Sequence, residues 1–141
     1  MACDRDVDDA AGAAWPAHHA RRETEIVLPL ALSRGLPIEA TVFVEAEHQQ
    51  LEQFGRGAKL ASTRIQRGDR HATRELRTCL AASCELARSH MTKEEEQLFP
   101  QIAARITDAD DALLVDRMAL IGPRDVTLFF AMLNEIETEI G

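Results

Sequence analysis

The sequence predicts an all-α fold, an up-down bundle of helices, and three observations support this prediction. Helix-forming Ala, Leu, Glu and Arg dominate the composition, whereas aromatic residues make up only 4% and tyrosine is absent. Apolar residues recur at steps of three and four along several segments, and no segment alternates as a strand does. A chain of 141 residues is long enough for one hydrophobic core, so we expect a single domain.

The first helix is expected to begin at Pro16, because proline lacks an N–H group that the first turn would leave unbonded anyway. It should end at Ser33, just before Gly35. Pro29 lies inside this helix and should kink it or distort its last turn. The residues before it, 1–14, are acidic and Ala-rich and are expected to form a flexible leader.

A second helix is predicted over residues 37–66, ending at the break formed by Gly68. The third is predicted over 69–106. Thr107 can then cap a further helix through its side-chain oxygen. We therefore assign residues 15–121 to the helical bundle, and the apolar segment 122–141 to a C-terminal helix.

Charge and hydropathy exclude two classes of partner. The net charge of −8, with no basic stripe, argues against a nucleic-acid-binding role. No apolar run approaches the ~20 residues that a membrane span needs. The N-terminus lacks the basic and apolar regions of a signal peptide, and three cysteines suit a reducing compartment, so we expect a cytoplasmic protein.

The most informative stretch is HMTKEEEQLFP, which begins at His90 and ends at Pro100. His90 and Glu94 are four residues apart and share one face of a helix. Both lie on the apolar stripe that faces the core: Leu76, Leu80, Ser83, Ala87, His90, Glu94 and Leu98. A carboxylate buried in this way needs a cation or strong hydrogen bonds, so the pair predicts a metal site.

The same pattern occurs a second time, where His19 and Glu23 precede Pro29 at the same spacings. This pair also interrupts an apolar stripe. In the second predicted helix His48 interrupts a stripe alone, while Glu52 is expected at its solvated edge. A histidine on an apolar face is commonly a structural residue, so His48 needs a further argument.

Residue counting supplies that argument. If the second and third helices turn near Gly68, His48 and His90 lie at nearly equal separations from the turn. At ~1.5 Å of rise per residue, their imidazoles then fall at about the same level. The first turn, near Gly35, brings Glu23 to the level of His48 in the same way. Imidazoles and carboxylates without thiolates suit iron best, with manganese or zinc as alternatives.

These motifs resemble the hemerythrin-like (HHE cation-binding) family. The resemblance rests on residues 19–29, on EHQQL from Glu47 to Leu51 and on residues 90–100, and covers about 15–120. It implies a four-helix bundle around a non-haem iron site, usually dinuclear, that binds or senses dioxygen or iron without being an enzyme. Carried over position by position, it implies these metal ligands: His19, Glu23, His48, His90 and Glu94.

One departure leaves several alternatives open. The family's first helix, with its own histidine, would precede residue 15, where there is no room for it. The C-terminal helices or a partner in a homodimer could complete the bundle, with Asp125 as a remote further ligand. The site could hold one ion or two. The alternative function is a degenerate, metal-free bundle that acts as a protein-interaction module.

Overall fold

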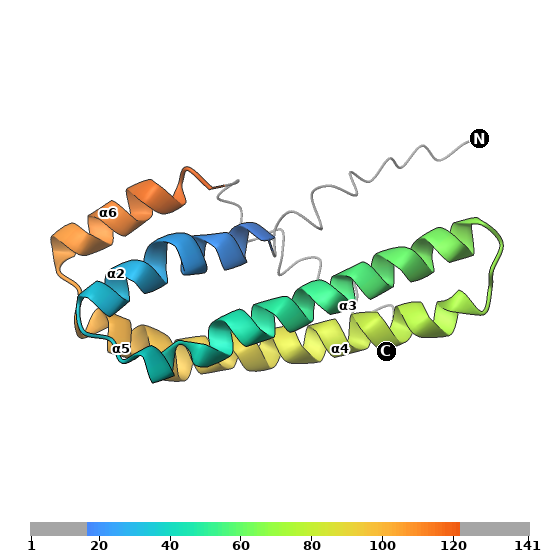
Figure 1. Ribbon diagram of the computed structural model, residues 1–141, viewed down its shortest axis with the longest axis horizontal. Helices are drawn as coiled ribbons and strands as arrows, with labels where there is room; N and C mark the ends of the chain where they lie inside the picture. The colour runs from blue at the N-terminus through green and yellow to red at the C-terminus, as the bar shows by residue number, and fades with distance from the viewer. Residues whose placement is uncertain (1–16, 122–141) are drawn as a thin grey trace.

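A computed structural model describes residues 17–121 of the chain, and every element in this part is helical (Figure 1). The predicted all-α bundle is therefore confirmed for these residues. The expected leader over 1–14, the C-terminal helix over 122–141 and Asp125 lie outside the described residues. No described helix is long and apolar enough to cross a membrane.

The largest unit is a hairpin of two long helices, α3 (Val42–Gln66) and α4 (Ala72–Lys93), which pack along their lengths. The turn between them depends on Gly68, whose φ of 97° is readily adopted only by glycine. The amide of Gly68 donates to Ile65 O (2.9 Å) and that of Asp69 to Arg64 O (3.0 Å). These bonds form a Schellman motif, which satisfies the last carbonyls of α3.

A first helical rod precedes the hairpin and lies beside the half of it that is remote from Gly68 (Figure 1). It comprises helical residues 17–22, a π-helical turn η1 (Glu23–Val27) and α2 (Leu28–Ser33). Gly35, with φ of 86°, ends it in a second Schellman motif. A short 3-10 turn, η2 (Ile38–Ala40), then leads into α3, so the second helix starts at Val42 rather than at residue 37.

The expected third helix is continuous but changes its hydrogen bonding part-way. After α4 the chain forms a second π-helical turn, η3 (Glu94–Leu98), followed by α5 (Phe99–Ala103). We call α4, η3 and α5 together the α4–α5 rod. Each π turn lies just before a proline, Pro29 in the first rod and Pro100 in the α4–α5 rod. Because proline has no N–H and its ring crowds the carbonyl four residues earlier, the preceding turn widens. The distortion expected at Pro29 is thus a π turn.

The apolar core fills the space between α2, the start of α3, η3 and α5. Its buried residues include Leu98 at 2% exposure and Val44 at 0%. The cluster is Leu28, Ala31, Leu36, Val44, Leu98 and Ile102. This core lies at the same end of the hairpin as the first rod, so it holds the first rod, α3 and the α4–α5 rod together.

The last described helix, α6 (Asp108–Met118), packs on the first rod and is held at both ends. Thr107 and Asp110 form a capping box at its start, which confirms the predicted Thr107 cap. The Asp110 carboxylate also accepts two hydrogen bonds from Arg34, at 2.7 and 3.0 Å. At the other end, Arg22 Nε donates to the carbonyls of Met118 and Ile121.

Two glycines inside α3 differ in their surroundings. A Cβ atom at Gly55 would meet nothing within 4 Å, whereas one at Gly57 would lie 2.8 Å from Cys79 Sγ on α4. Gly57 therefore permits the close approach of the two hairpin helices, and Gly55 has no such role.

We predict that Gly55→Ala raises the free energy of unfolding by about 0.5–1 kcal/mol, because alanine loses less backbone entropy in a helix. Gly57→Ala should gain less or should destabilise, because the Cys79 thiol must move. In a Cys79→Ala background the two substitutions should have the same effect. Denaturant unfolding of the five variants measures this; a Gly57→Ala gain equal to that of Gly55→Ala in the parent chain would contradict it.

Candidate metal centre

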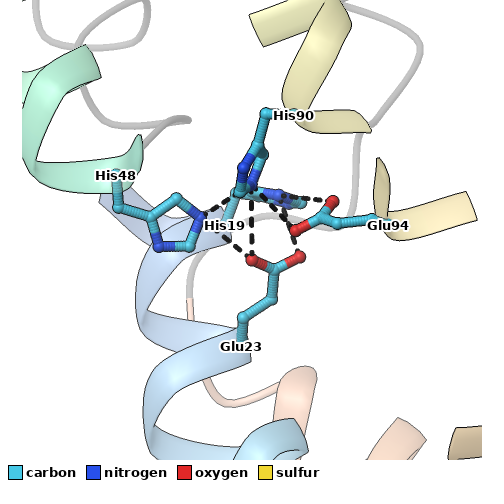
Figure 2. Close-up of side chains that lie close together, drawn as sticks. All are labelled: His19, Glu23, His48, His90 and Glu94. Carbon is cyan, nitrogen blue, oxygen red and sulfur yellow. Dashed lines mark hydrogen bonds and ion pairs between the residues drawn. The ribbon is translucent and has the colours of Figure 1, made fainter. Parts of the chain in front are cut away.

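Five side chains from the first rod, the hairpin helices and η3 converge at one point between the helices (Figure 2). His19 lies in the first turns of the first rod and Glu23 at the start of its π turn. His48 comes from α3, His90 from α4, and Glu94 begins the second π turn. One ligand atom from each of these residues lies within 4.8 Å of all the others. The predicted convergence in one layer of the bundle is thus present.

The two halves of the site have the same local structure. In each, a histidine is followed four residues later by a glutamate that opens a π turn, and the glutamate carbonyl accepts an i→i+5 hydrogen bond. The donors of these two bonds are the backbone amides of Leu28 and Phe99. The π turn widens the helix immediately after each glutamate, at the site itself, where such bulges are frequent in proteins.

The contacts within the cluster are short and shared. His19 Nε2 lies 3.0 Å from Glu23 Oε1 and 3.7 Å from Glu94 Oε2. His48 Nε2 lies 3.0 Å from both Glu23 Oε2 and His90 Nε2. His90 Nε2 in turn lies 2.8 Å from Glu94 Oε1. Each imidazole nitrogen that faces the centre therefore has at least two close polar neighbours.

Hydrogen bonds alone do not satisfy this arrangement. A ring nitrogen carries at most one proton, so His48 Nε2 can donate to only one of its two neighbours at 3.0 Å. Glu23 Oε2 and Glu94 Oε1 are close to imidazoles, yet neither makes a hydrogen bond of acceptable geometry. Both atoms are buried. Buried polar atoms without partners are rare in proteins, and a missing ion is one explanation for them.

Burial and charge act against each other at these groups. Burial by itself lowers the pKa of His19, but the Glu23 and Glu94 carboxylates outweigh it and raise that pKa to about 9. Burial likewise raises the pKa of Glu23, whereas His19 and His48 lower it to about 2. The carboxylate of Glu23 is thus ionised, and without a metal a proton on His19 partly compensates it.

The charge of the cluster matches a divalent cation. In the form that binds a metal, two glutamate carboxylates and three neutral imidazoles would carry −2 in total. Glu23 and Glu94 are 6% and 2% exposed, so water cannot screen this charge effectively. Isolated buried carboxylates are very unfavourable, and they are normally paired or bind a metal. A bound divalent ion would bring the net charge of the site to zero.

The distances also fit one ion. With metal–ligand bonds of about 2.1 Å, neighbouring donors around an ion lie about 3 Å apart and opposite donors about 4.2 Å apart. The closest pairs in the cluster are 2.8–3.0 Å apart, and the widest separation among the chosen ligand atoms is 4.8 Å. The five residues therefore fit a single ion with little movement.

Sequence reasoning assigned no role to Glu47 and Lys93, which lie just outside the cluster. His90 Nδ1 donates to Glu47 Oε2 at 2.9 Å, and Lys93 Nζ donates to Glu47 Oε1. The only signals in the sequence are the adjacency of Glu47 to His48 and the place of Lys93 one turn after His90. Neither signal reveals a contact between residues more than forty positions apart.

The expectation for Glu52 is confirmed. Its side chain is 61% exposed and pairs with Arg56 one turn further along α3. It takes no part in the cluster.

Known proteins provide no further guide to the function. No family model matches the chain, and neither the curated proteins nor the solved structures yield a significant match. Function is therefore inferred from the chemistry of the site.

We predict that His19 and Glu23 together stabilise the metal-free protein most between about pH 4.5 and 6.5. The raised pKa of His19 stabilises the fold fully below its ordinary value of 6.5, and this contribution is lost as the pH rises through about 9. The lowered pKa of Glu23 stabilises the fold above 4.5, and this contribution is lost as the pH falls through about 2.

Denaturant unfolding of chelator-treated protein at pH 5.5, 7.5 and 9 measures this dependence. A His19→Gln variant should lose much of the decline between pH 6.5 and 9, whereas a variant of the exposed His71, His71→Gln, should keep it. An equally steep decline in His19→Gln would contradict the assignment to His19.

Proposed function

We propose that this protein is a hemerythrin-like, non-haem iron protein that holds one ferrous ion between its helices. The ligands would be His19, Glu23, His48, His90 and Glu94. The observation that supports this most directly is the convergence of five buried or half-buried donor atoms within 4.8 Å of one another. Two of these residues also have a buried carboxylate oxygen without a well-formed hydrogen bond, Glu23 Oε2 and Glu94 Oε1.

The donor set favours iron. Three imidazoles and two carboxylates, with no thiolate, suit ferrous iron; manganese and zinc accept similar ligands. Zinc prefers a closed site of about four ligands, which five converging donors exceed. Calcium and magnesium prefer oxygen ligands, so the imidazole majority disfavours them. The resemblance to the hemerythrin-like family supports the same metal.

The compactness of the site favours one ion over the usual pair. Two ions held about 3.5–4 Å apart would place the terminal ligands of one well beyond 4.8 Å from those of the other. The five ligand atoms of this site show no such spread. Their number also matches one coordination sphere better than two.

The ion would supply an open coordination position at which dioxygen or a similar small molecule binds. Five protein donors leave room for about one further ligand on a six-coordinate ion. The chain itself provides burial: Leu98 at the end of η3 and Val44 on α3 belong to the adjoining apolar core. Such surroundings would limit the access of water to the ion on that side of the site. We therefore infer that the protein binds or senses dioxygen or iron rather than catalysing a reaction.

We predict that chelated protein, titrated anaerobically with ferrous iron, binds about one ion per chain. His90→Ala and Glu94→Gln should each weaken binding strongly, because they remove buried ligands, while His71→Ala should bind iron as the parent does. Admitting air to the iron form should change its near-ultraviolet spectrum. Metal analysis after gel filtration and anaerobic titration measure these effects.

Two ions per chain would contradict the single-ion arrangement but not the metal site. A parent chain that binds no ferrous iron under these conditions would overturn the proposal. The metal-free interaction module would then become the better explanation, and His90→Ala should leave its partner binding unchanged.

We also predict that ferrous iron binds more tightly as the pH rises from 6.5 to 8.5, by about tenfold per pH unit while one proton is displaced. The displaced proton is that of His19, whose pKa is about 9 in the metal-free protein. Anaerobic titrations at three pH values in buffers of different ionisation enthalpy measure both the affinity and the proton release. An affinity independent of pH would contradict this.

A further inference from the structure

His90 is the centre of a second set of contacts that faces away from the metal cluster. Its Nε2 points to the cluster, while its Nδ1 donates to Glu47 Oε2 at 2.9 Å. Glu47 is itself bonded through its other oxygen to Lys93 Nζ. Phe43, one turn before Glu47, packs edge-on against the His90 ring with centroids 5.8 Å apart. We call Phe43, Glu47 and Lys93 the outer triplet.

The hydrogen bond to Glu47 determines which nitrogen of His90 is available. A carboxylate can only accept a hydrogen bond, so the proton of the neutral imidazole lies on Nδ1. The lone pair is then on Nε2, the atom that faces the cluster. The same bond, with the Phe43 contact, restrains rotation of the ring, so His90 is held ready to donate to an ion.

Lys93 restrains Glu47 in turn. Its ammonium group binds Glu47 Oε1 and lies 5.6 Å from the centre of the Phe43 ring. The two oxygens of Glu47 thus have separate partners, His90 on one and Lys93 on the other. Without Lys93, the charged Glu47 would be free to turn away from His90.

His48 has no such support. Its Nδ1 is buried and has no hydrogen-bond partner among the described residues. The orientation and tautomer of the His48 ring are therefore not fixed by an outer contact, in contrast to those of His90. This difference between two histidines 3.0 Å apart indicates that His90 is the pre-organised ligand of the pair.

We propose that Glu47 is a positioning residue for metal binding, which fixes His90 through Nδ1, and that Lys93 holds Glu47 in that role. The inference rests on the proposed metal site and extends it to residues that do not touch the ion. The contacts come from opposite helices of the hairpin, Phe43 and Glu47 from α3, His90 and Lys93 from α4. Metal affinity is thereby linked to the pairing of α3 with α4.

Glu47→Gln and Glu47→Leu separate the two effects of this residue. Glutamine keeps an acceptor for His90 Nδ1 but removes the charge, whereas leucine removes both. We expect ferrous iron affinity to fall by about tenfold or more in Glu47→Leu and by less in Glu47→Gln, the usual range for such outer residues. The matched control is Glu45→Gln, an exposed glutamate on the same helix, which should bind as the parent does.

Lys93→Met and Lys93→Arg test the second step. Methionine should weaken iron binding, because it releases Glu47, and arginine should restore it, because its guanidinium can bind the same carboxylate. Cobalt(II), bound in place of iron, provides a readout that would not change if Glu47 and Lys93 had a merely structural role. Its visible absorption spectrum reports the ligand field, and it should change in Glu47→Leu and Lys93→Met but not in Glu45→Gln.

The outcomes distinguish this inference from the metal site itself. If the parent binds ferrous iron and both Glu47 variants bind it with unchanged affinity and unchanged cobalt spectrum, the positioning role is wrong while the site stands. If the parent binds no iron, the proposed function fails first. Thermal unfolding of each metal-free variant identifies any that are not folded, and Glu47→Gln is then the deciding variant.

Discussion

Two carboxylates, those of Glu23 and Glu94, lie almost wholly buried between helices, and the rest of the structure has to accommodate them. Burying each ionised carboxylate costs on the order of several kcal/mol unless an opposite charge compensates it. Three imidazoles from three helical segments surround the carboxylates but do not complete their hydrogen bonding. The packing of α3, α4 and the first rod therefore depends on a positive charge at their common centre, from a proton or from a metal ion.

The two prolines contribute to this arrangement through the backbone. Pro29 and Pro100 each lie six residues after a buried glutamate, and each is preceded by a π-helical turn. A proline that opens a short helix cannot donate the usual hydrogen bond, and the widened turn before it absorbs the mismatch. The two halves of the site thus use the same local structure, which explains why the sequence motif extends well beyond the histidine and the glutamate.

The hairpin and the first rod have different parts in the site. α3 and α4 pack along their full lengths and contribute His48, His90 and the outer triplet, so this part is held by many contacts. The first rod, with His19 and Glu23, is attached by the apolar core and by α6 through Arg34 and Asp110. Opening of the site would therefore separate the first rod from the hairpin more readily than it would split the hairpin.

The sequence by itself determined the helices, their ends at Gly35 and Gly68, the cap at Thr107 and the five residues of the cluster. These features depend on local geometry: the 3.6-residue period, the left-handed glycine and the constant rise per residue. Only the tertiary structure showed the π turns, the salt bridge between Arg34 and Asp110, and the contact of Glu47 with His90. Such contacts depend on how far each helix is rotated about its axis and how closely it approaches its neighbour. Those quantities are set by packing over the whole bundle, not by any one stretch of sequence.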